Sequence, residues 1–376
     1  MAFAFLAGIR VLDLSQYLPG PLACQMLADL GADVVKVEAP AGDPMRGLDP
    51  IVGRAGTAGD GNPFYRTLNA GKRVVRLDLK ADGGKARFAR LLNAADVILE
   101  SFRPGVMDRL GFGPEAARAG NPGLVYCSLS GYGQTGPLRL AAGHDLNYMA
   151  ASGALSQAGG PDGPAMAWPP MADCAGAAMS ALAILGALVR RGRDGQGAYL
   201  DVAMADCVAS WQASGLTAAK LDGLAARGEG LLTGGAACYR CYSCADGGYL
   251  SVGALEEIFW ANFCQAVCRA DWAARQWEPL PQSELIADVT ALLASRTLDH
   301  WLGVLEGVDT CVRPVLDYAE VAADPQAQAR GLIRDGGAGA VEVLLPLLAD
   351  GADAGARAPA RFVGAEEVLQ DWKVSA

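Results

Sequence analysis

The feature that most constrains the fold is the alternation of strand and helix patterns between residues 9 and 129. Ile9 to Leu14 predicts a strand, Pro21 to Leu30 predicts a helix that ends near Gly31, and Val34 to Val37 predicts a second strand. The same alternation continues with a helix at 85–92 and strands at 97–100 and 124–129. Strands that alternate with helices form parallel sheets covered on both faces, so we expect an α/β fold with a Rossmann-like parallel-sheet large domain.

The turn after the first predicted strand lacks the common phosphate-binding glycine motifs. It reads Ser15-Gln16-Tyr17-Leu18-Pro19-Gly20-Pro21, with one glycine and no Walker lysine. The sequence therefore carries no dinucleotide or ATP fingerprint in this turn, and a ligand of this sheet must be held in another way.

Two segments interrupt this alternation. Residues 40–70 are rich in Gly, Pro and Asp and predict a long loop. The longest apolar stretch, Met179 to Val189, is shorter than the roughly 20 residues that a membrane span needs, so it predicts a buried helix. A strand is expected after it, at Tyr199 to Val202.

The second half of the chain predicts a smaller α+β domain. Tyr239 to Tyr242 and Tyr249 to Val252 flank a Gly-Gly turn and predict a hairpin. Helical patterns follow at 256–268, 283–293 and 298–305. We therefore expect a large α/β domain over 1–219 that is completed by 331–376, a linker over 220–235, and a small α+β domain over 236–330.

Composition and charge exclude several classes of protein. Of the 376 residues, 52% are hydrophobic and 19% are charged, which is typical of a globular enzyme. The net charge of −10 argues against a nucleic-acid-binding protein, and a polyanionic ligand would need a local basic patch. The N-terminal segment MAFAFLAGIRVLDLS lacks a charged region and a cleavage motif, so we expect a cytoplasmic protein without a membrane partner.

The ten cysteines predict reduced thiols, because their spacing is irregular. Cys238, Cys241 and Cys244 have the C-x-x-C-x-x-C spacing of some metal sites. A strand through this segment would turn Cys241 away from the other two, so we expect no metal.

Four residues are candidates for chemistry. His144 follows Gly143 and precedes a helical pattern, where backbone N–H groups can bind an oxyanion, although a structural role is equally compatible. Asp173 stands at the start of the apolar helix; an N-cap is the more common role, and a desolvated acid–base or nucleophilic carboxylate is the alternative. Glu256 opens a helix after a strand, and His300 on an amphipathic pattern predicts a structural role.

Several longer segments together resemble the CaiB/BaiF superfamily over nearly the whole chain. They are Val11 to Ser15, Ala28 to Glu38, Leu77 to Lys80, Phe102 to Gly111 and Ser130 to Pro137. Within that superfamily, Gly143 to Tyr148 and Val252 to Glu256 are similar to the α-methylacyl-CoA racemase branch, whereas the transferase branch shares chiefly the aspartate that matches Asp173.

The resemblance implies a fold, a reaction and a set of site residues. It implies interlocked homodimers with linkers that cross between subunits, and an active site between the large domain of one and the small domain of the other. His144 paired with Glu256 would face one side of the substrate α-carbon and Asp173 the other, with the backbone N–H of Asp145 stabilising an enolate. Coenzyme A would enter as part of the substrate thioester, without a prosthetic group. Its expected contacts are Leu77, Lys80, Phe102, Arg103 and Arg109.

Three functions follow from these residues. The first is inversion at C2 of a 2-methylacyl-CoA by two-base proton transfer; the second is family III CoA transfer through a covalent intermediate on Asp173; the third is a non-catalytic CoA-binding homologue. The loop Leu232 to Ala237 departs from the racemase pattern at Thr233 and Ala237, where racemases usually have Asp and Pro. The resemblance implies that this loop borders the acyl group of the substrate.

Overall fold

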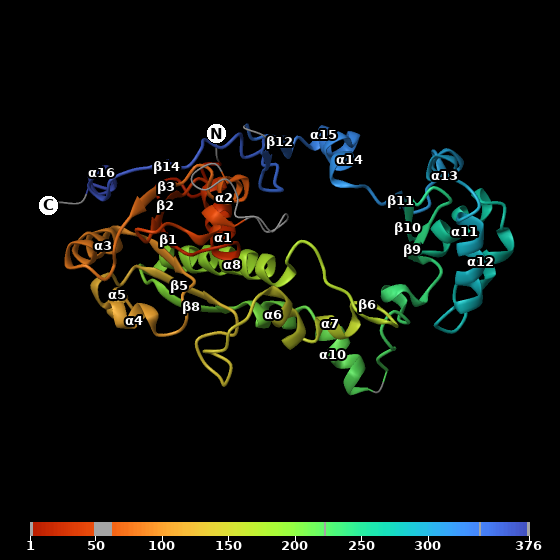
Figure 1. Ribbon diagram of the computed structural model, residues 1–376, viewed down its shortest axis with the longest axis horizontal. Helices are drawn as coiled ribbons and strands as arrows, with labels where there is room; N and C mark the ends of the chain where they lie inside the picture. Colours follow the sequence, from red (N-terminus) through yellow and green to blue (C-terminus); the bar gives the residue numbers. More distant parts are fainter. Residues whose placement is uncertain (1–2, 49–61, 222, 338–339, 374–376) are drawn as a thin grey trace. The chain divides into compact units, whose positions relative to one another are not determined.

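The computed structural model describes residues 3–48, 62–221, 223–337 and 340–373, which divide into two compact units (Figure 1). Unit 1 comprises Met1–Ala151, Trp168–Ser210 and Pro325–Ala376, and unit 2 comprises Ser152–Ala167 and Trp211–Asp324. Residues 152–167 thus belong with unit 2, whereas the sequence pattern grouped them with the large domain.

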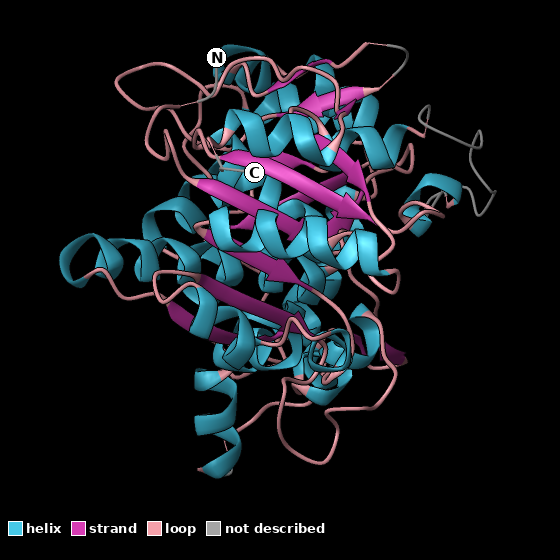
Figure 2. Cartoon of the chain, turned by 90° about the vertical axis from the view of Figure 1, so that its left-hand side faces the viewer, coloured by secondary structure: helices cyan, strands magenta, loops and turns pink. Residues whose placement is uncertain are grey.

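Unit 1 is built on a seven-stranded parallel sheet. Its strands, in spatial order, are β14 (Arg361–Phe362), β3 (Arg73–Arg76), β2 (Asp33–Glu38), β1 (Arg10–Leu14), β4 (Val97–Glu100), β5 (Val125–Ser130) and β8 (Ala198–Ala203). Figure 2 shows these strands side by side under a layer of helices. The expectation of a Rossmann-like parallel sheet is confirmed.

The helices of unit 1 pack on both faces of this sheet. Helices α1 and α8 contact each other and cover one face of the sheet. Helices α3 and α16 pack together over the apolar side chains of the opposite face. The helices are α1 (Pro19–Asp29), η1 (Pro44–Gly47), α2 (Pro63–Asn69), α3 (Asp82–Ala94), α4 (Val106–Leu110), α5 (Pro114–Gly120), α6 (Asp145–Ala151), α8 (Met171–Asp194), α9 (Met204–Ser210), α15 (Pro325–Arg330) and α16 (Ala365–Asp371). A small hairpin of β12 (Ile333–Asp335) and β13 (Val341–Val343) completes the unit.

The strand order creates a switch point between β1 and β4. The chain leaves β1 through α1 toward β2, and leaves β4 through α4 and α5 toward β5, so the two connections diverge. Ligands of open parallel sheets bind in the crevice that such a divergence leaves at the carboxyl ends of the strands. The turns after Leu14 and Glu100 therefore lie where a site is expected.

Two expectations for unit 1 are wrong in part. The expected loop over 40–70 contains η1 and α2, because the Asn62 side chain accepts hydrogen bonds from the N–H groups of Phe64 and Tyr65 and caps α2. Residues 49–61 of that loop lie outside the described residues. Strands β3 and β14 went unpredicted because both are short, with four and two residues.

Helix α8 is longer than its apolar stretch indicated. The residues 171–178 before this stretch and 190–194 after it extend the helix to 24 residues. Among the described helices it alone has the length and composition to cross a membrane. Buried core helices meet the same criteria, and α8 packs against α1, β5 and β8. Its N-terminus carries Asp173.

Unit 2 contains a three-stranded antiparallel sheet, β11 (Val312–Pro314), β10 (Tyr249–Gly253) and β9 (Tyr239–Ser243), which confirms the predicted hairpin. Trp260, Phe263 and Trp272 are fully buried in its core. The other elements are α7 (Ala154–Gln157), β6 (Gly159–Gly160), β7 (Gly163–Pro164), α10 (Ala213–Lys220), η2 (Leu231–Gly235), α11 (Glu257–Ala266), η3 (Ala270–Arg275), α12 (Ser283–Leu293), α13 (Leu298–Leu305) and α14 (Tyr318–Ala323).

The cysteines of the C-x-x-C-x-x-C segment follow the strand alternation. Cys238 and Cys244 are buried at the two ends of β9, and Cys241 is exposed. All ten cysteines are free thiols. Within the described part of the chain, no group of three His, Cys, Asp or Glu side chains is arranged to hold a metal ion.

Candidate active site

A cavity of about 580 Å³ lies at the carboxyl ends of β1, β4 and β5 in unit 1. We call it the larger cavity, because a smaller cavity of unit 1 shares a wall with it. It is lined by Gln16, Tyr17, Pro19, Ser101, Phe102, Arg103, Pro104, Val106, Leu129, Ser130, Gly131, Tyr132, Arg139, Ala141, Ala142, Gly143, His144, Tyr148, Asp173 and Met204. The sheet thus places two of the residues singled out for chemistry, His144 and Asp173, on one cavity.

Asp145 links the starts of α6 and α8, two helices that carry residues of this cavity. Asp145 is the first residue of α6. Its Oδ1 accepts hydrogen bonds from the N–H groups of Ala172 at 2.6 Å and Asp173 at 3.2 Å, at the start of α8. The N-cap residue of α8, Pro170, has no side chain that can serve. Asp145 therefore caps α8 from another helix, and the interpretation of Asp173 as the cap is wrong.

Asp173 is consequently left with its carboxylate on the cavity wall. The side chain is half-buried, and burial together with the nearby negative charge of Asp145 raises the pKa of Asp173 to about 7. A carboxyl group that titrates near neutral pH can take up and release protons under physiological conditions. The desolvated-carboxylate alternative is the one the geometry supports.

His144 precedes α6 on the rim of the same cavity, and its side chain is exposed. Its backbone is fixed, because its N–H donates to Asn147 Oδ1 at 3.0 Å and its carbonyl accepts from the N–H of Asn147 at 2.8 Å. The imidazole is therefore anchored through its main chain while its ring remains available to a ligand.

Two tyrosines that sequence reasoning missed support the His144 turn. The Tyr148 hydroxyl donates to the Gly143 carbonyl at 2.5 Å, and its ring packs edge-on against Tyr132 with centroids 5.1 Å apart. Burial raises the pKa of Tyr148 to about 12, and Asp173 contributes to that rise. Tyr148 lies four residues after His144, a helical spacing that places it under the turn, and this was the available signal.

A smaller cavity of about 220 Å³ adjoins the same two turns. Its lining includes Leu77, Lys80 and Phe102, three of the five expected CoA contacts, together with the turn after β1. Gln16, Phe102 and Val106 line both cavities, so the two share one wall. An elongated ligand can therefore place one end in each.

The other two expected CoA contacts lie elsewhere. Arg103 is exposed and lines the larger cavity. Arg109 is exposed on α4 and lines neither cavity, although Val106 and Leu110 of the same helix line the smaller one. Arg139 on the larger cavity is a further cation that sequence reasoning missed.

The position of Phe102 depends on the buried side chain of Glu100. Glu100 Oε2 accepts a hydrogen bond from the Phe102 N–H at 2.9 Å. Burial raises the pKa of Glu100 to about 7 against the lowering effect of hydrogen bonds from Ser128 and Phe102. The carboxyl group thus fixes the turn that forms the shared wall.

Glu256 lies in unit 2, as the N-cap residue of α11, and its side chain is exposed. Three residues earlier, Gly253 lines a cavity of about 710 Å³ in unit 2. Thr233 and Gly234, from the loop that departs from the racemase pattern, line it as well. His300 is exposed on α13, where its ring packs edge-on against Trp301 with centroids 5.1 Å apart.

Comparison with known proteins identifies what this arrangement is similar to. A family model described as CoA-transferase family III matches residues 6–360. The α-methylacyl-CoA racemase of Homo sapiens is 36% identical over 334 residues, which cover 87% of this chain and 81% of the relative. The acetyl-CoA:oxalate CoA-transferase of Acetobacter aceti is 34% identical over 340 residues, which cover 88% of this chain and 86% of the relative.

A solved structure agrees with these relationships. The crystal structure of a CAIB/BAIF family protein from Brucella suis superposes with a TM-score of 0.82 at 30% sequence identity, covering 98% of this chain and 99% of the other. The relatives include both a racemase and transferases, and both act on CoA thioesters by name.

Proposed function

The chain belongs to CoA-transferase family III, and on this premise we propose that it is a racemase that inverts C2 of 2-methylacyl-CoA thioesters. The observation that carries the proposal is the larger cavity, in which Asp173, a carboxyl with a pKa of about 7, and the His144 imidazole line one space. Two proton-transfer groups on one cavity are what inversion at a carbon acid requires.

The proposed reaction proceeds in two proton transfers. One of the two groups removes the proton from C2, which leaves an enolate of the thioester, and the other returns a proton to the opposite face. The negative charge grows on the thioester oxygen, where the backbone N–H of Asp145 at the start of α6 is the proposed donor. Asp145 also fixes Asp173 by capping α8.

The coenzyme A part of the substrate is assigned to the wall shared by the two cavities. The smaller cavity with Leu77, Lys80 and Phe102 suits the nucleotide end, and the thioester end then reaches His144 and Asp173 past Gln16. Lys80 and Arg103 supply positive charge for the phosphates in a chain of net charge −10.

We propose that Glu256 acts in the active site of a second subunit. In an interlocked homodimer, Glu256 of the partner subunit would hydrogen-bond His144 and hold its ring toward the substrate, as the family resemblance implies. The assembly is checked by sedimentation velocity during dilution: a folded monomer with full activity would contradict it.

CoA transfer is the second candidate, because several relatives are transferases and the Asp173 carboxylate can also act as a nucleophile toward a thioester. The deciding experiment incubates the protein with a single enantiomer of a 2-methylacyl-CoA in deuterated water without an acceptor acid. Racemisation predicts inversion with deuterium at C2. A second incubation contains an acceptor acid. Transfer of CoA to this acid, inhibited by hydroxylamine and without deuterium at C2, would show that the protein is a transferase and not a racemase.

Replacing Lys80 by alanine should weaken CoA binding by about 1.5 kcal/mol, roughly tenfold, because a charge-assisted contact to phosphate is lost. Isothermal titration with free CoA measures the effect. The matched control is Lys85→Ala on α3, which lines neither cavity. Equal affinities in the two variants would remove Lys80 from the phosphate site.

Replacing Asp145 by asparagine should move the pH dependence of the reaction. The amide still accepts hydrogen bonds from Ala172 and Asp173, but the negative charge that helps raise the pKa of Asp173 is gone. In the direction in which Asp173 removes the proton, kcat/KM rises with pH through about 7 in the wild type, and this rise should shift to lower pH. An unshifted profile, equal to that of the exposed control Asp82→Asn, would contradict the coupling.

A further inference from the structure

Tyr17, in the turn between β1 and α1, has an unusual backbone. Its φ is +61°, in the left-handed region that large side chains rarely adopt. A glycine would adopt this conformation without strain. A bulky residue held in a strained conformation beside a cavity points to a functional constraint, provided that its surroundings impose the conformation.

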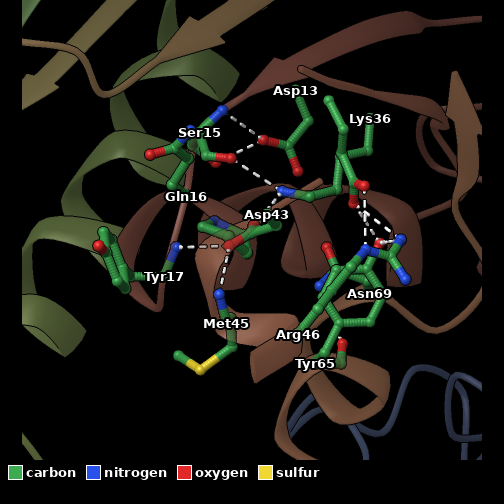
Figure 3. Close-up of polar contacts among 12 residues, drawn as sticks. Asp13, Ser15, Gln16, Tyr17, Lys36, Asp43, Met45, Arg46, Tyr65 and Asn69 are labelled. Atoms are coloured by element: carbon green, nitrogen blue, oxygen red, sulfur yellow. Dashed lines mark hydrogen bonds and ion pairs between the residues drawn. The ribbon is translucent and has the colours of Figure 1, made fainter. Parts of the chain in front are cut away.

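Buried charges impose that conformation (Figure 3). Lys36 Nζ donates to the Ser15 carbonyl at 2.8 Å and forms an ion pair with Asp43 at 2.9 Å. Asp43 Oδ1 in turn lies 3.5 Å from the Tyr17 N–H and accepts from the Met45 N–H at 2.9 Å. The Ser15 carbonyl, two residues before Tyr17, and the amide of Tyr17 itself are therefore both held.

A second ion pair fixes the start of the turn. Lys72 Nζ lies 2.9 Å from Asp13 Oδ2, and both side chains are fully buried. Asp13 Oδ1 accepts from the Ser15 N–H at 3.0 Å and also from the Ser15 hydroxyl. Since these groups are buried with their partners satisfied, the turn has little freedom to relax away from the strained conformation.

The turn presents the Tyr17 side chain to the larger cavity. Gln16 lies on the wall that both cavities share and is tied to the turn after β4, because its N–H donates to Ser101 Oγ at 3.2 Å. Tyr17 lines only the larger cavity, with His144 and Asp173, and remains 43% exposed. In Figure 3 its ring points away from the buried charges that hold its backbone.

We propose that Tyr17 is a substrate-contacting residue whose ring packs against the pantetheine arm of an acyl-CoA in the larger cavity. The inference rests on the proposed function in taking an acyl-CoA as the ligand. A turn that served folding alone would favour glycine at this φ and would have no use for an exposed aromatic ring. The buried ion pairs keep the ring beside the shared wall before the substrate arrives, which reduces the ordering that binding requires.

The test separates the two ends of the ligand. Isothermal titration compares a 2-methylacyl-CoA with adenosine 3′,5′-bisphosphate, which has the nucleotide but neither pantetheine nor acyl group. Tyr17→Gly keeps the backbone conformation and removes the ring, so it should weaken acyl-CoA binding at least tenfold, leave bisphosphate binding unchanged and not lower Tm. Tyr17→Phe should bind both ligands within twofold of the wild type.

The matched control is Cys268→Gly, which relieves a similar φ of +57° in unit 2 and should change neither affinity. Unchanged acyl-CoA binding by Tyr17→Gly, or equal losses for both ligands, overturns the proposal, as does a loss in Tyr17→Phe as large as in Tyr17→Gly. A different result would contradict the proposed racemase reaction alone. If the wild-type protein binds acyl-CoA but places no deuterium at C2, that reaction is wrong and the comparison of the Tyr17 variants is still valid. Wild-type protein that binds no acyl-CoA contradicts both.

Discussion

Replacing His144 by alanine should lower the proposed racemisation by about 10² to 10⁴-fold, because one of the two proposed proton-transfer groups is lost. Asp173 on the same cavity remains, so one enantiomer of a 2-methylacyl-CoA should still exchange its C2 proton with deuterated water without inversion. Asp173→Asn should show the reciprocal pattern, with exchange retained only in the opposite enantiomer. Mass spectrometry and chiral chromatography of the recovered thioester measure both quantities.

The other histidine of the chain provides the control. His300 is exposed on α13 in unit 2, and His300→Ala should leave both exchange and inversion at the wild-type rate. A transferase with Asp173 as its nucleophile predicts a different outcome, since His144→Ala would retain much of its CoA transfer. Loss of exchange in both enantiomers in each single variant would contradict two independent bases on opposite faces.

Replacing Lys72 by methionine should destabilise the protein by about 3 to 5 kcal/mol, because it leaves the fully buried Asp13 carboxylate without its partner at 2.9 Å. Burial alone would raise the pKa of Asp13, but Lys36 and Lys72 hold it at about 2, below its ordinary value of 3.8. The stabilisation from Asp13 is therefore present above pH 3.8 and is lost as the pH falls toward 2. Urea unfolding at neutral pH measures the free energy of unfolding.

The control for this variant is an exposed ion pair of the same unit. Arg87 lies 3.9 Å from Glu366, both side chains are more than half exposed, and Arg87→Met should cost at most about 1 kcal/mol. The double variant Asp13→Leu/Lys72→Met should recover part of the stability, since neither charge is then left unpaired. A loss below about 1 kcal/mol in Lys72→Met would show that the pair does not fix the turn that carries Tyr17.

The sequence was sufficient for five of the seven strands of the parallel sheet because the information that builds them is local. The run from Ile9 to Val37 contains its own strand, helix and strand, and Gly31, with a φ of +101°, ends the helix where predicted. Each element is recognised from the period of its apolar residues, without knowledge of its neighbours. The short strands β3 and β14 contain too few residues to show a period, and they form because β3 pairs with β2 and β14 pairs with β3.

The sequence by itself determined the order of the main elements, the family, and the residue types available for chemistry at His144, Asp173 and Glu256. Only the tertiary structure decided that Asp145 caps α8 from 27 residues away and leaves Asp173 on a cavity. It also decided that Lys36 and Lys72 are buried ion-pair partners rather than surface charges. The reason is physical: periodicity is a property of neighbouring residues, whereas a cap, a pKa and a cavity wall depend on which distant atoms are brought within a few ångströms.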